Sequence, residues 1–357
     1  MKKYCFVIPR LSSGGAERAI SVFASGIAEL GNDVYLIIYN HSKEEYPVSD
    51  KVTRYYRCDE KYSSNKAIEF LQKLINVRRF LKENEIDIVV PFLENCVIHT
   101  FFASRGLNIK FVSSLRNNPY MLSKKERCST DFITKLADAH FVQNQMQKEY
   151  YSEAIQKKTF IVTNPVSNVF IDNAKHYNDS VKKLVAVGRL NFQKNYYMLI
   201  DAMKIVAEKY RDIVLEIYGE GEEQSKLEKY ISTNGLQSNI HLMGRSEDVK
   251  SVYDNSDIFV MTSDFEGMPN SLMEAMCFGM PCISTDCPTG PSELIQDGVN
   301  GYLVPMGDSK VLAERIIDFI NNPEKAKEFG ETARTSCGHI HSGEAVCKQL
   351  VQYLDRV

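Results

Sequence analysis

The stretch YCFVIPRLSSGGAERAISVFASGIAELGNDVYLIIY, Tyr4 to Tyr39, decides the predicted fold. Two short apolar runs, YCFVI and VYLIIY, flank a segment from 16 to 30 with helical spacing, which Gly31 closes. The apolar residues of that segment recur at intervals of three and four: Ala16, Ala19, Ile20, Phe23, Ala24 and Ile27. This spacing places them on one face of a helix. A strand, a helix and a second strand form a βαβ unit, which predicts a parallel sheet.

The same alternation runs through the rest of the chain. Strands are expected at DIVVPF, KFVSSL, AHFVQ and TFIVT in the first half, and at LVAVG, IVLEIY, NIHLM, DIFVMT and PCIST in the second. The pattern breaks in a polar stretch at 165–180, which we interpret as a linker. We therefore predict an α/β fold with two Rossmann-like, doubly wound domains, 1–165 and 181–339, facing a central cleft. In such sheets ligands bind outside the carboxyl ends of the strands.

The composition is that of a globular chain. Of 357 residues, 44% are hydrophobic and 25% are charged, and there is no low-complexity tract. The length suits two domains. The first apolar run ends at Pro9 and Arg10, too early for the hydrophobic segment of a signal peptide or for a membrane span. We therefore expect a cytoplasmic protein.

The net charge of -3 conceals an uneven distribution. Residues 1–170 hold 24 Lys and Arg against 18 Asp and Glu, whereas residues 171–357 hold 19 against 28. A basic first half could face a phosphate-bearing partner or the anionic inner face of the cell membrane. Ordinary scatter on a solvated surface explains the asymmetry equally well. No nucleic-acid partner is expected.

The nine cysteines lie mostly inside apolar runs, as Cys5 does in YCFVI. They are expected to be reduced and buried. Cys277, Cys282 and Cys287 share a spacing of five, but a helix, a strand and the following loop would aim them apart. Because no His-x-His or Cys-x-x-Cys pattern accompanies them, we expect no metal site.

Three glycine-bearing loops each follow a predicted strand. SSGGAER, residues 12–18, opens the first helix with Gly14 and Gly15, where the backbone can approach an anion closely. YGEGEE at 218–223 and MGRSEDV at 243–249 contain Gly219 and Gly244, and could contact a flat base through the main chain. Each loop could equally be a plain turn. Since the first is not G-x-G-x-x-G and no acidic residue ends the next strand, NAD binding is disfavoured.

A basic loop ends the first strand of the second domain. VGRLNFQKN, residues 187–195, carries Arg189 and Lys194. A guanidinium and an ammonium at the carboxyl end of a strand suit a diphosphate and can replace a divalent metal. A solvated basic loop is the alternative.

The stretch FEGMPNSLMEAMCFGMP, residues 265–281, places Glu266 and Glu274 eight positions apart. Ser271 and Glu274 fit an S-x-x-E capping box, and Gly279 ends the helix, so capping explains Glu274 without chemistry. It does not explain Glu266, nor a helix start whose N–H groups suit a phosphate. A retaining glycosidase needs carboxyl groups about 5 Å apart, whereas eight helical residues span about 12 Å. Separate roles are therefore expected.

Together these stretches resemble the glycosyltransferases of family 4, retaining enzymes of the GT-B fold. Glu266 and Glu274 match that family's E-x7-E motif, within the block EGMPNSLMEAMCFGMPCISTDCPTGPSELIQDGVNGYLV. SGGAE, GRL with Lys194, and GEGEE occur in the family's order. The resemblance covers nearly the whole chain and is strongest to the branch that builds capsules, O-antigens and lipid-linked glycans. It implies that a last helix, within 340–357, crosses back to the first domain.

The resemblance also implies a reaction. A hexosyl or N-acetylhexosaminyl group would move from a nucleotide sugar, with UDP favoured by family frequency, to a lipid-linked or surface-polysaccharide acceptor. The first domain would hold the acceptor, and the product would carry an α linkage. Neither metal nor cofactor would be needed, because preorganised positive charge would stabilise the leaving diphosphate. A phosphate oxygen of the leaving group would help to remove the acceptor proton, which would explain why no nucleophile is evident.

The family's site residues carry over by position. Arg189 and Lys194 would neutralise the leaving diphosphate. Glu266 would hold hydroxyl groups of the transferred sugar, and Glu274 would accept from those of the ribose. The other donor-binding residues that the resemblance implies are Gly14, Gly15, Gly219, Gly244, Arg245, Asn270, Ser271 and Leu272.

One position departs from the family. Many relatives carry a histidine at the end of a first-domain strand, where SSLRNNP places Arg116 and Asn117. An arginine cannot act as a general base there. We therefore expect Arg116 to contact the donor phosphates or the acceptor.

Two other functions stay open on the same fold: a sugar-nucleotide epimerase and a catalytically silent sugar-nucleotide-binding module. An epimerase would convert a free UDP-sugar without an acceptor. In a silent module, Glu266→Ala would change ligand affinity alone. A phosphorylase fits less well, since it needs a lysine for pyridoxal phosphate and a much longer chain.

Overall fold

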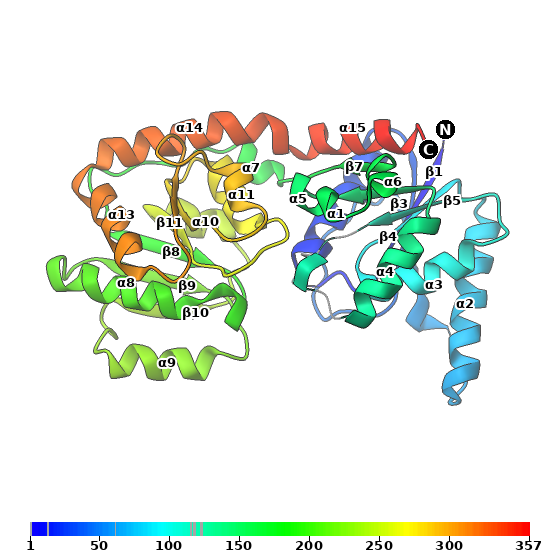
Figure 1. Cartoon of the computed structure of the whole chain (residues 1–357), viewed down its shortest axis with the longest axis horizontal. Helices are drawn as coiled ribbons and strands as arrows, with labels where there is room; N and C mark the ends of the chain where they lie inside the picture. The colour runs from blue at the N-terminus through cyan, green and yellow to red at the C-terminus, as the bar shows by residue number, and fades with distance from the viewer. Residues whose placement is uncertain (1, 13, 61, 115, 117–118, 122–123) are drawn as a thin grey trace. The chain divides into compact units, whose positions relative to one another are not determined.

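The computed structural model describes residues 2–12, 14–60, 62–114, 116, 119–121 and 124–357. The contacts divide the chain into two compact units. The N-terminal unit joins Met1–Pro165 to Gly343–Val357, and the C-terminal unit is Val166–Ser342. In each unit helices flank a sheet (Figure 1).

The sheet of the N-terminal unit has the strand order β3-β2-β1-β4-β5-β6-β7, and all its pairs are parallel. The strands are β1 Lys3–Ile8, β2 Asp33–Ile38, β3 Val52–Tyr56, β4 Ile88–Pro91, β5 Lys110–Ser114, β6 Ala139–Val142 and β7 Thr159–Ile161. β1 lies at the centre because nearly all of KYCFVI is apolar and buried. The order reverses after β1, so the topological switch point lies between β1 and β4.

Helices cover both faces of this sheet. They are α1 Gly15–Glu29, η1 Arg57–Asp59, α2 Lys66–Glu83, α3 Glu94–Ser104, η2 Pro119–Met121, α4 Lys124–Leu136, α5 Gln145–Glu149, α6 Glu153–Gln156 and α15 Gly343–Leu354. Phe6 faces the core under α1 and α15, while Cys5 faces the core under α2 and α3. α1 and α15 approach closely, since a Cβ on Gly26 would lie 2.6 Å from Cys347 Sγ. The last helix therefore belongs to the N-terminal unit.

The C-terminal unit has a second parallel sheet, in the order β10-β9-β8-β11-β12-β13. Its strands are β8 Lys183–Val187, β9 Val214–Tyr218, β10 Ile240–Gly244, β11 Ile258–Met261, β12 Cys282–Thr285 and β13 Tyr302–Val304. Its helices are α7 Asn168–Ile171, η3 Phe192–Lys194, α8 Tyr196–Lys209, α9 Gln224–Thr233, α10 Val249–Asp254, α11 Asn270–Phe278, α12 Pro291–Leu294, α13 Ser309–Asn321 and α14 Pro323–His341. Here the switch point lies between β8 and β11.

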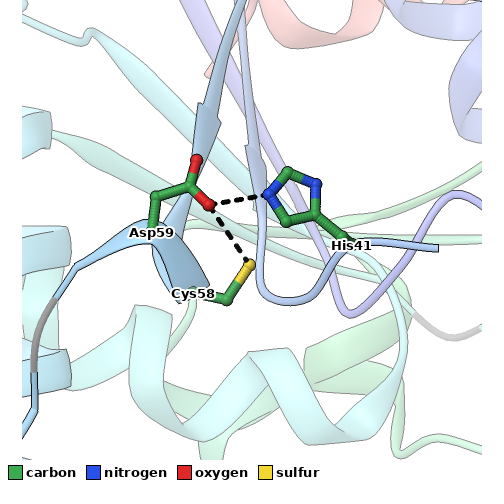
Figure 2. A group of neighbouring side chains, drawn as sticks. All are labelled: His41, Cys58 and Asp59. Atoms are coloured by element: carbon green, nitrogen blue, oxygen red, sulfur yellow. Dashed lines mark hydrogen bonds and ion pairs between the residues drawn. The ribbon is translucent and has the colours of Figure 1, made fainter.

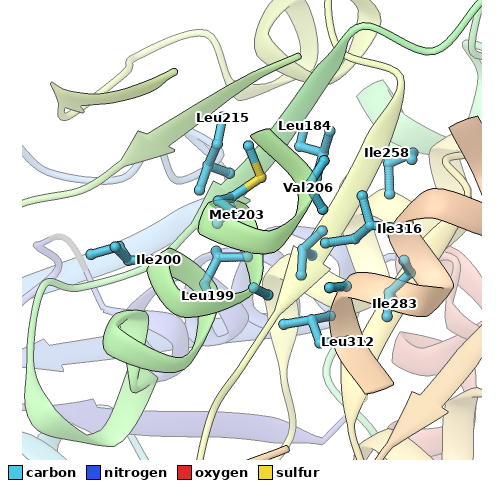
Figure 3. Close-up of a cluster of buried hydrophobic side chains, with 14 of the residues drawn as sticks. Leu184, Leu199, Ile200, Met203, Val206, Leu215, Ile258, Ile283, Leu312 and Ile316 are labelled. Carbon is cyan, nitrogen blue, oxygen red and sulfur yellow. The ribbon is translucent and has the colours of Figure 1, made fainter. Parts of the chain in front are cut away.

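Aliphatic side chains fill the layer between this sheet and α8 and α13. Figure 3 shows Leu184 of β8 and Ile283 of β12 among side chains of α8 and α13, such as Met203 and Ile316. All four are fully buried. On the other face α11 packs through Leu272 and its neighbours. Both faces of β8 and β11 are therefore covered, which leaves the loops at their carboxyl ends as the place for a ligand.

The polar stretch interpreted as a linker packs instead on the C-terminal unit. It contains α7, whose Phe170 is buried against Phe278 with ring centroids 6.5 Å apart. Lys175 N–H donates to Phe278 O, and Tyr177 Oη donates to Gly279 O. The segment therefore covers the end of α11. Its few apolar residues, such as Phe170, pack against this unit. They are too few for their spacing to predict a helix.

The sequence analysis missed β3 and β13. Both are short strands at a sheet edge, where part of each strand stays half-exposed. Within the described ranges, no helix combines the length and apolar character needed to cross a bilayer.

Candidate active site

The loops after β8 and β11 form the core of the candidate site. These strands are neighbours, and their carboxyl ends flank the switch point of the sheet. The first loop carries Arg189 and Lys194, and the second carries Glu266 just before α11. The fold therefore brings together two of the regions that the sequence analysis assigned to the donor.

Hydrogen bonds join the two loops directly. Asp264 N–H donates to Gln193 O at 2.9 Å, and Gln193 Nε2 donates to Phe265 O at 2.8 Å. Thr262 Oγ1 donates to Lys194 O at 2.9 Å, which fixes the backbone beside the cation. Asn195 has a left-handed φ of 44° and donates through Nδ2 to Asp264 Oδ1. The loops are thus held as one unit before any ligand binds.

Lys194 and Glu266 form a buried ion pair at this junction. Lys194 Nζ lies 2.7 Å from Glu266 Oε1, and the two side chains are 15% and 8% exposed. Ser263 Oγ donates to the same carboxylate oxygen at 2.7 Å. Gly188 makes room for the lysine stem, since a Cβ there would lie 2.8 Å from Lys194 Cε. The cation is therefore aligned by its neighbours and is already charge-compensated.

The charge of Glu266 acts on its buried neighbours. Burial, together with this carboxylate, raises the pKa of the Tyr196 hydroxyl, which donates to Gly188 O. Burial and the same carboxylate raise the pKa of Cys287 to about 12. Both groups therefore stay neutral near pH 7, and neither can supply a nucleophilic anion.

A third loop, after β12, contacts the backbone of Glu266. Thr289 has a left-handed φ of 67°, unusual for a β-branched residue, and its hydroxyl donates to Glu266 O. Gly290 has a φ of 98°, and a Cβ there would lie 2.5 Å from Pro269 Cδ. Backbone in sparsely populated regions is characteristic of functional sites. Sequence reasoning missed Ser263 and Thr289, although Thr289 lies inside the block EGMP to GYLV that carried the resemblance.

The predicted capping box is wrong. α11 begins at Asn270 with Pro269 at the N-cap, and no side chain caps it. Ser271 therefore lies inside the first turn, because Met273 N–H already donates to Pro269 O. Glu274 is buried, with 4% exposure, in the following turn. Capping consequently does not explain Glu274, while Gly279 ends the helix in a left-handed conformation as predicted.

Comparison with known proteins agrees with this architecture. Residues 170–336 match the family model "Glycosyl transferases group 1". A Campylobacter jejuni α-1,4-N-acetyl-D-galactosaminyltransferase acting on GalNAc-alpha-(1->4)-GalNAc-alpha-(1->3)-diNAcBac-PP-undecaprenol is 28% identical, over 94% of both chains. The amylovoran biosynthesis glycosyltransferase AmsD of Erwinia amylovora is 27% identical, over 93% of this chain and 94% of that protein. The fold is that of Anabaena HepE in complex with UDP-glucose, with a TM-score of 0.82 at 16% identity over the whole of both chains.

The chain is a glycosyltransferase of the GT-B fold.

In the transferase the other proposed donor residues of the C-terminal unit lie on three elements. Arg189 and Arg245 are exposed on the loops after β8 and β10. Asn270 and Ser271 are half-buried in the first turn of α11. The Leu272 side chain is fully buried in the core, so only its backbone remains for a ligand.

Gly219 and Gly244 hold the loops beside the site together. Gly219 N–H donates to Gly244 O at 2.8 Å, and Gly188 N–H donates to Tyr218 O at 2.9 Å. Gly219 has a φ of 146°, and a Cβ there would lie 1.9 Å from Gly188 O. Close packing of two backbones explains this glycine without a ligand.

Gly219→Ala is therefore expected to destabilise the transferase by at least about 2 kcal/mol, from backbone strain and overlap. Urea unfolding followed by circular dichroism measures this loss. Gly235→Ala is the matched control, since Gly235 also has a left-handed φ but nothing within 4 Å of its Cβ position. Equal losses in both variants would show that contact with Gly188 is unimportant.

The N-terminal unit carries the remaining sequence-predicted residues. Gly14 is the N-cap of α1 with an extended backbone, and Gly15 is its first residue. The Glu17 carboxylate folds over this start, because a Cβ on Gly14 would lie 2.0 Å from Glu17 Oε2. Gly14 therefore leaves room for the Glu17 carboxylate.

Arg116 has surroundings that the sequence did not predict. It is only 5% exposed, and its guanidinium lies over the rings of Phe92 and Phe141 at 4.6 and 5.1 Å. Arg116 Nη2 donates to Asn164 Oδ1 at 2.7 Å. Burial lowers its pKa to about 9. The side chain thus lies in an aromatic core instead of on an open surface, and Asn117 lies outside the described residues.

Proposed function

We propose that the chain transfers a hexosyl or N-acetylhexosaminyl group from a UDP-sugar to a lipid-linked or surface-glycan acceptor. The configuration at the anomeric carbon is retained, the linkage formed is α, and no metal takes part. The observation that carries this proposal is the buried Lys194–Glu266 pair at the switch point, held by Ser263.

Positive charge at this point suits the leaving group. When the anomeric carbon–oxygen bond breaks, UDP departs with its negative charge on the diphosphate. Lys194 and Arg189 offer charge-assisted hydrogen bonds to it, and the start of α11 adds a positive dipole end. Charges placed before the reaction stabilise the transition state at little reorganisation cost.

Binding of the donor diphosphate to Lys194 would free Glu266 from its ion pair with that lysine. Lys194 bonds to Glu266, so a phosphate oxygen that reaches Lys194 would compete with that carboxylate. Glu266 can then turn toward hydroxyl groups of the transferred sugar while Ser263 still donates to it. We assign Glu274 to the ribose, Gly14 and Gly15 to the diphosphate, and the segment of Gly244 and Arg245 to the base.

Retention follows from a front-face departure. The acceptor oxygen bonds to the anomeric carbon on the face that the diphosphate leaves, and the acceptor proton passes to a leaving phosphate oxygen. No enzyme nucleophile is required. This agrees with the neutral state of Tyr196 and Cys287 beside Glu266.

Relatives and structural neighbours support the choice of donor and linkage. Solved structures of HepE contain UDP, glucose or UDP-glucose, and one of Staphylococcus aureus TarM contains UDP and alpha-GlcNAc-glycerol. The Campylobacter relative acts on an undecaprenol-linked glycan. These similarities support UDP, an α product and a lipid-linked acceptor for this chain.

A nucleotide-sugar panel tests the proposal. The protein is screened by thermal shift with UDP- and GDP-sugars, and a donor at 100 times its dissociation constant should add about 2.7 kcal/mol of stability. NMR then follows that donor with EDTA present, with and without polyprenyl-linked acceptors. Formation of an α-glycoside and UDP supports the proposal. Conversion of the donor without an acceptor would identify an epimerase instead, and binding without turnover would identify a silent module.

A lipid-linked acceptor would place the protein at a membrane, and exposed apolar side chains on three helices of the N-terminal unit suit that position. We call this set the α2–α4 apolar face; its members are Ile68, Phe70, Leu71, Ile75, Ile98, Phe102, Phe132 and Leu136. α2 packs on α3 and α3 on α4, and Figure 1 shows the three helices within that unit. α2 also carries five Lys and Arg against two Glu. Apolar and basic side chains together suit an anionic lipid surface.

Leu71→Gln with Ile75→Gln is expected to weaken binding to phosphatidylglycerol-containing vesicles about tenfold or more, because two apolar side chains no longer enter the lipid. Cosedimentation measures this binding. Val169→Gln with Met306→Gln is the matched control, since both residues are similarly exposed in the C-terminal unit. Equal binding by the two double variants would exclude this face as the contact.

A further inference from the structure

A group of metal-ligating side chains lies in the N-terminal unit after β2 and β3, on segments that carry none of the residues assigned to the donor. β2 and β3 are parallel and in register, with Ile38 opposite Tyr56. His41 follows Ile38 by three positions and Asp59 follows Tyr56 by three, so both leave the sheet at the same edge. Cys58 precedes Asp59 in the turn η1. The pairing of the strands thus gathers residues that are 17 and 18 positions apart in the sequence.

Neighbouring contacts hold the two segments in place. The Arg57 guanidinium lies over the Tyr39 ring, 3.3 Å from its centroid, and joins the turn η1 to the end of β2. Tyr62 Oη donates to Arg57 O at 2.7 Å. The His41 ring stacks on Tyr56 with centroids 4.2 Å apart and an interplanar angle of 21°. The backbone near all three side chains is therefore restrained before any ion binds.

The ligand atoms themselves are close together. His41 Nε2 lies 2.7 Å from Asp59 Oδ1, and Cys58 Sγ lies 3.9 Å from the same oxygen (Figure 2). All three ligand atoms lie within 4.8 Å of one another. Tetrahedral zinc with ordinary bond lengths separates its nitrogen, oxygen and sulfur ligands by about 3.3–3.6 Å. Small rotations of these exposed side chains would reach that spacing.

We propose that His41, Cys58 and Asp59 bind one zinc ion, with water as the fourth ligand. One imidazole, one thiolate and one carboxylate form a donor set that favours zinc over magnesium or calcium. Zinc binds the thiolate form of a cysteine, so binding would release the thiol proton. The ion would join the loop after β2 to the turn after β3. This proposal does not rest on the proposed function.

The spacing of the cysteines predicts no metal site, and His41, Cys58 and Asp59 come together only through the pairing of β2 with β3. A lone His–Asp contact would need no metal to explain it, and the chain contains one. His176 Nδ1 lies 3.0 Å from Asp254 Oδ1 in the C-terminal unit, and no third ligand is grouped with that pair in the described part of the chain. The first site has a cysteine, Cys58, beside its His–Asp pair, and the second has none grouped with it among the described residues. Substitution of His176 is therefore a matched control for substitution of His41.

The test is a cobalt titration of the full chain, free of tags, after treatment with EDTA and a reductant. We expect one equivalent of Co²⁺ to produce two signals: a thiolate-to-cobalt charge-transfer band in the near ultraviolet, and the visible absorption bands of four-coordinate cobalt. Addition of Zn²⁺ should displace the Co²⁺ and remove both signals. Cys58→Ser should abolish the charge-transfer band, and His41→Asn should weaken zinc binding about tenfold or more. Cys128→Ser, at another exposed cysteine, and His176→Asn should leave both unchanged.

Absence of the band in the wild-type chain would overturn the proposal. Its persistence in Cys58→Ser, or its loss in Cys128→Ser, would place any bound metal elsewhere. Circular dichroism of each variant shows whether the fold is intact, and because these side chains are exposed, all four variants should fold. Donor turnover is not part of the readout, so the result stands apart from the enzymatic assays.

Discussion

Glu266→Gln is expected to lower the turnover number about 10²- to 10³-fold while leaving donor binding intact or tighter. Glutamine keeps the shape of the side chain and can still accept from Ser263, but it no longer carries the charge that Lys194 faces. Lys194 then meets the diphosphate without a competing carboxylate. The sugar, in contrast, loses an anionic acceptor for its hydroxyl groups. Steady-state kinetics and UDP titration calorimetry separate the two effects.

Glu216→Gln is the control for this change. Glu216 lies on β9 in the same unit, pairs with Lys183 at 3.0 Å, and has a side chain that is 15% exposed. Its substitution removes a similar ion pair away from the switch point and should leave turnover near that of the wild type. If both variants turned over equally well, Glu266 would have only a structural role.

Lys194→Met is expected to weaken UDP binding about ten- to a hundredfold and to reduce turnover about 10²- to 10³-fold. The side chain keeps its apolar stem against Gly188 but loses the ammonium that would bond the leaving phosphate. It also leaves Glu266 buried without a cation, which costs up to about 3–5 kcal/mol of folding stability. Titration calorimetry, steady-state kinetics and urea unfolding measure the three quantities.

A second variant separates the loss of catalysis from the loss of stability. In Lys194→Met with Glu266→Gln no unpaired charge remains, so most of the stability should return while activity stays low. Lys183→Met serves as the control for removing a lysine from an ion pair. Recovery of turnover along with stability in the double variant would contradict a catalytic role for Lys194.

The central strands and the main helices could be predicted from the sequence, because their apolar patterns are continuous. β1 and β11 are almost entirely buried, and α1 shows a clear apolar stripe. The edge strands β3 and β13 could not, since an edge position does not require an unbroken apolar run. α7 was hidden for a related reason: one buried phenylalanine in a short polar segment is too weak a periodic signal.

The candidate site was predictable where several residues form one pattern. Lys194 and Glu266 belong to such patterns, and the fold places them 2.7 Å apart. Ser263 and Thr289 act as single polar residues whose roles depend on which loops meet, so the sequence holds no signal for them. The surroundings of Arg116 could not be predicted either. Its place after β5 suggested a ligand, but Phe92 and Phe141, distant in sequence, surround it.

The position of α15 has a consequence for folding during synthesis. Val346, Leu350 and Leu354 of that helix complete the core beneath α1, yet the ribosome makes them after the entire C-terminal unit. All residues of the C-terminal unit have therefore been synthesised before the N-terminal core receives α15. Domains often fold in the order of their synthesis. Here the N-terminal unit, whose synthesis begins first, can complete its core only after the last helix has been made. Until then the apolar surface under α1 is open to chaperones and proteases.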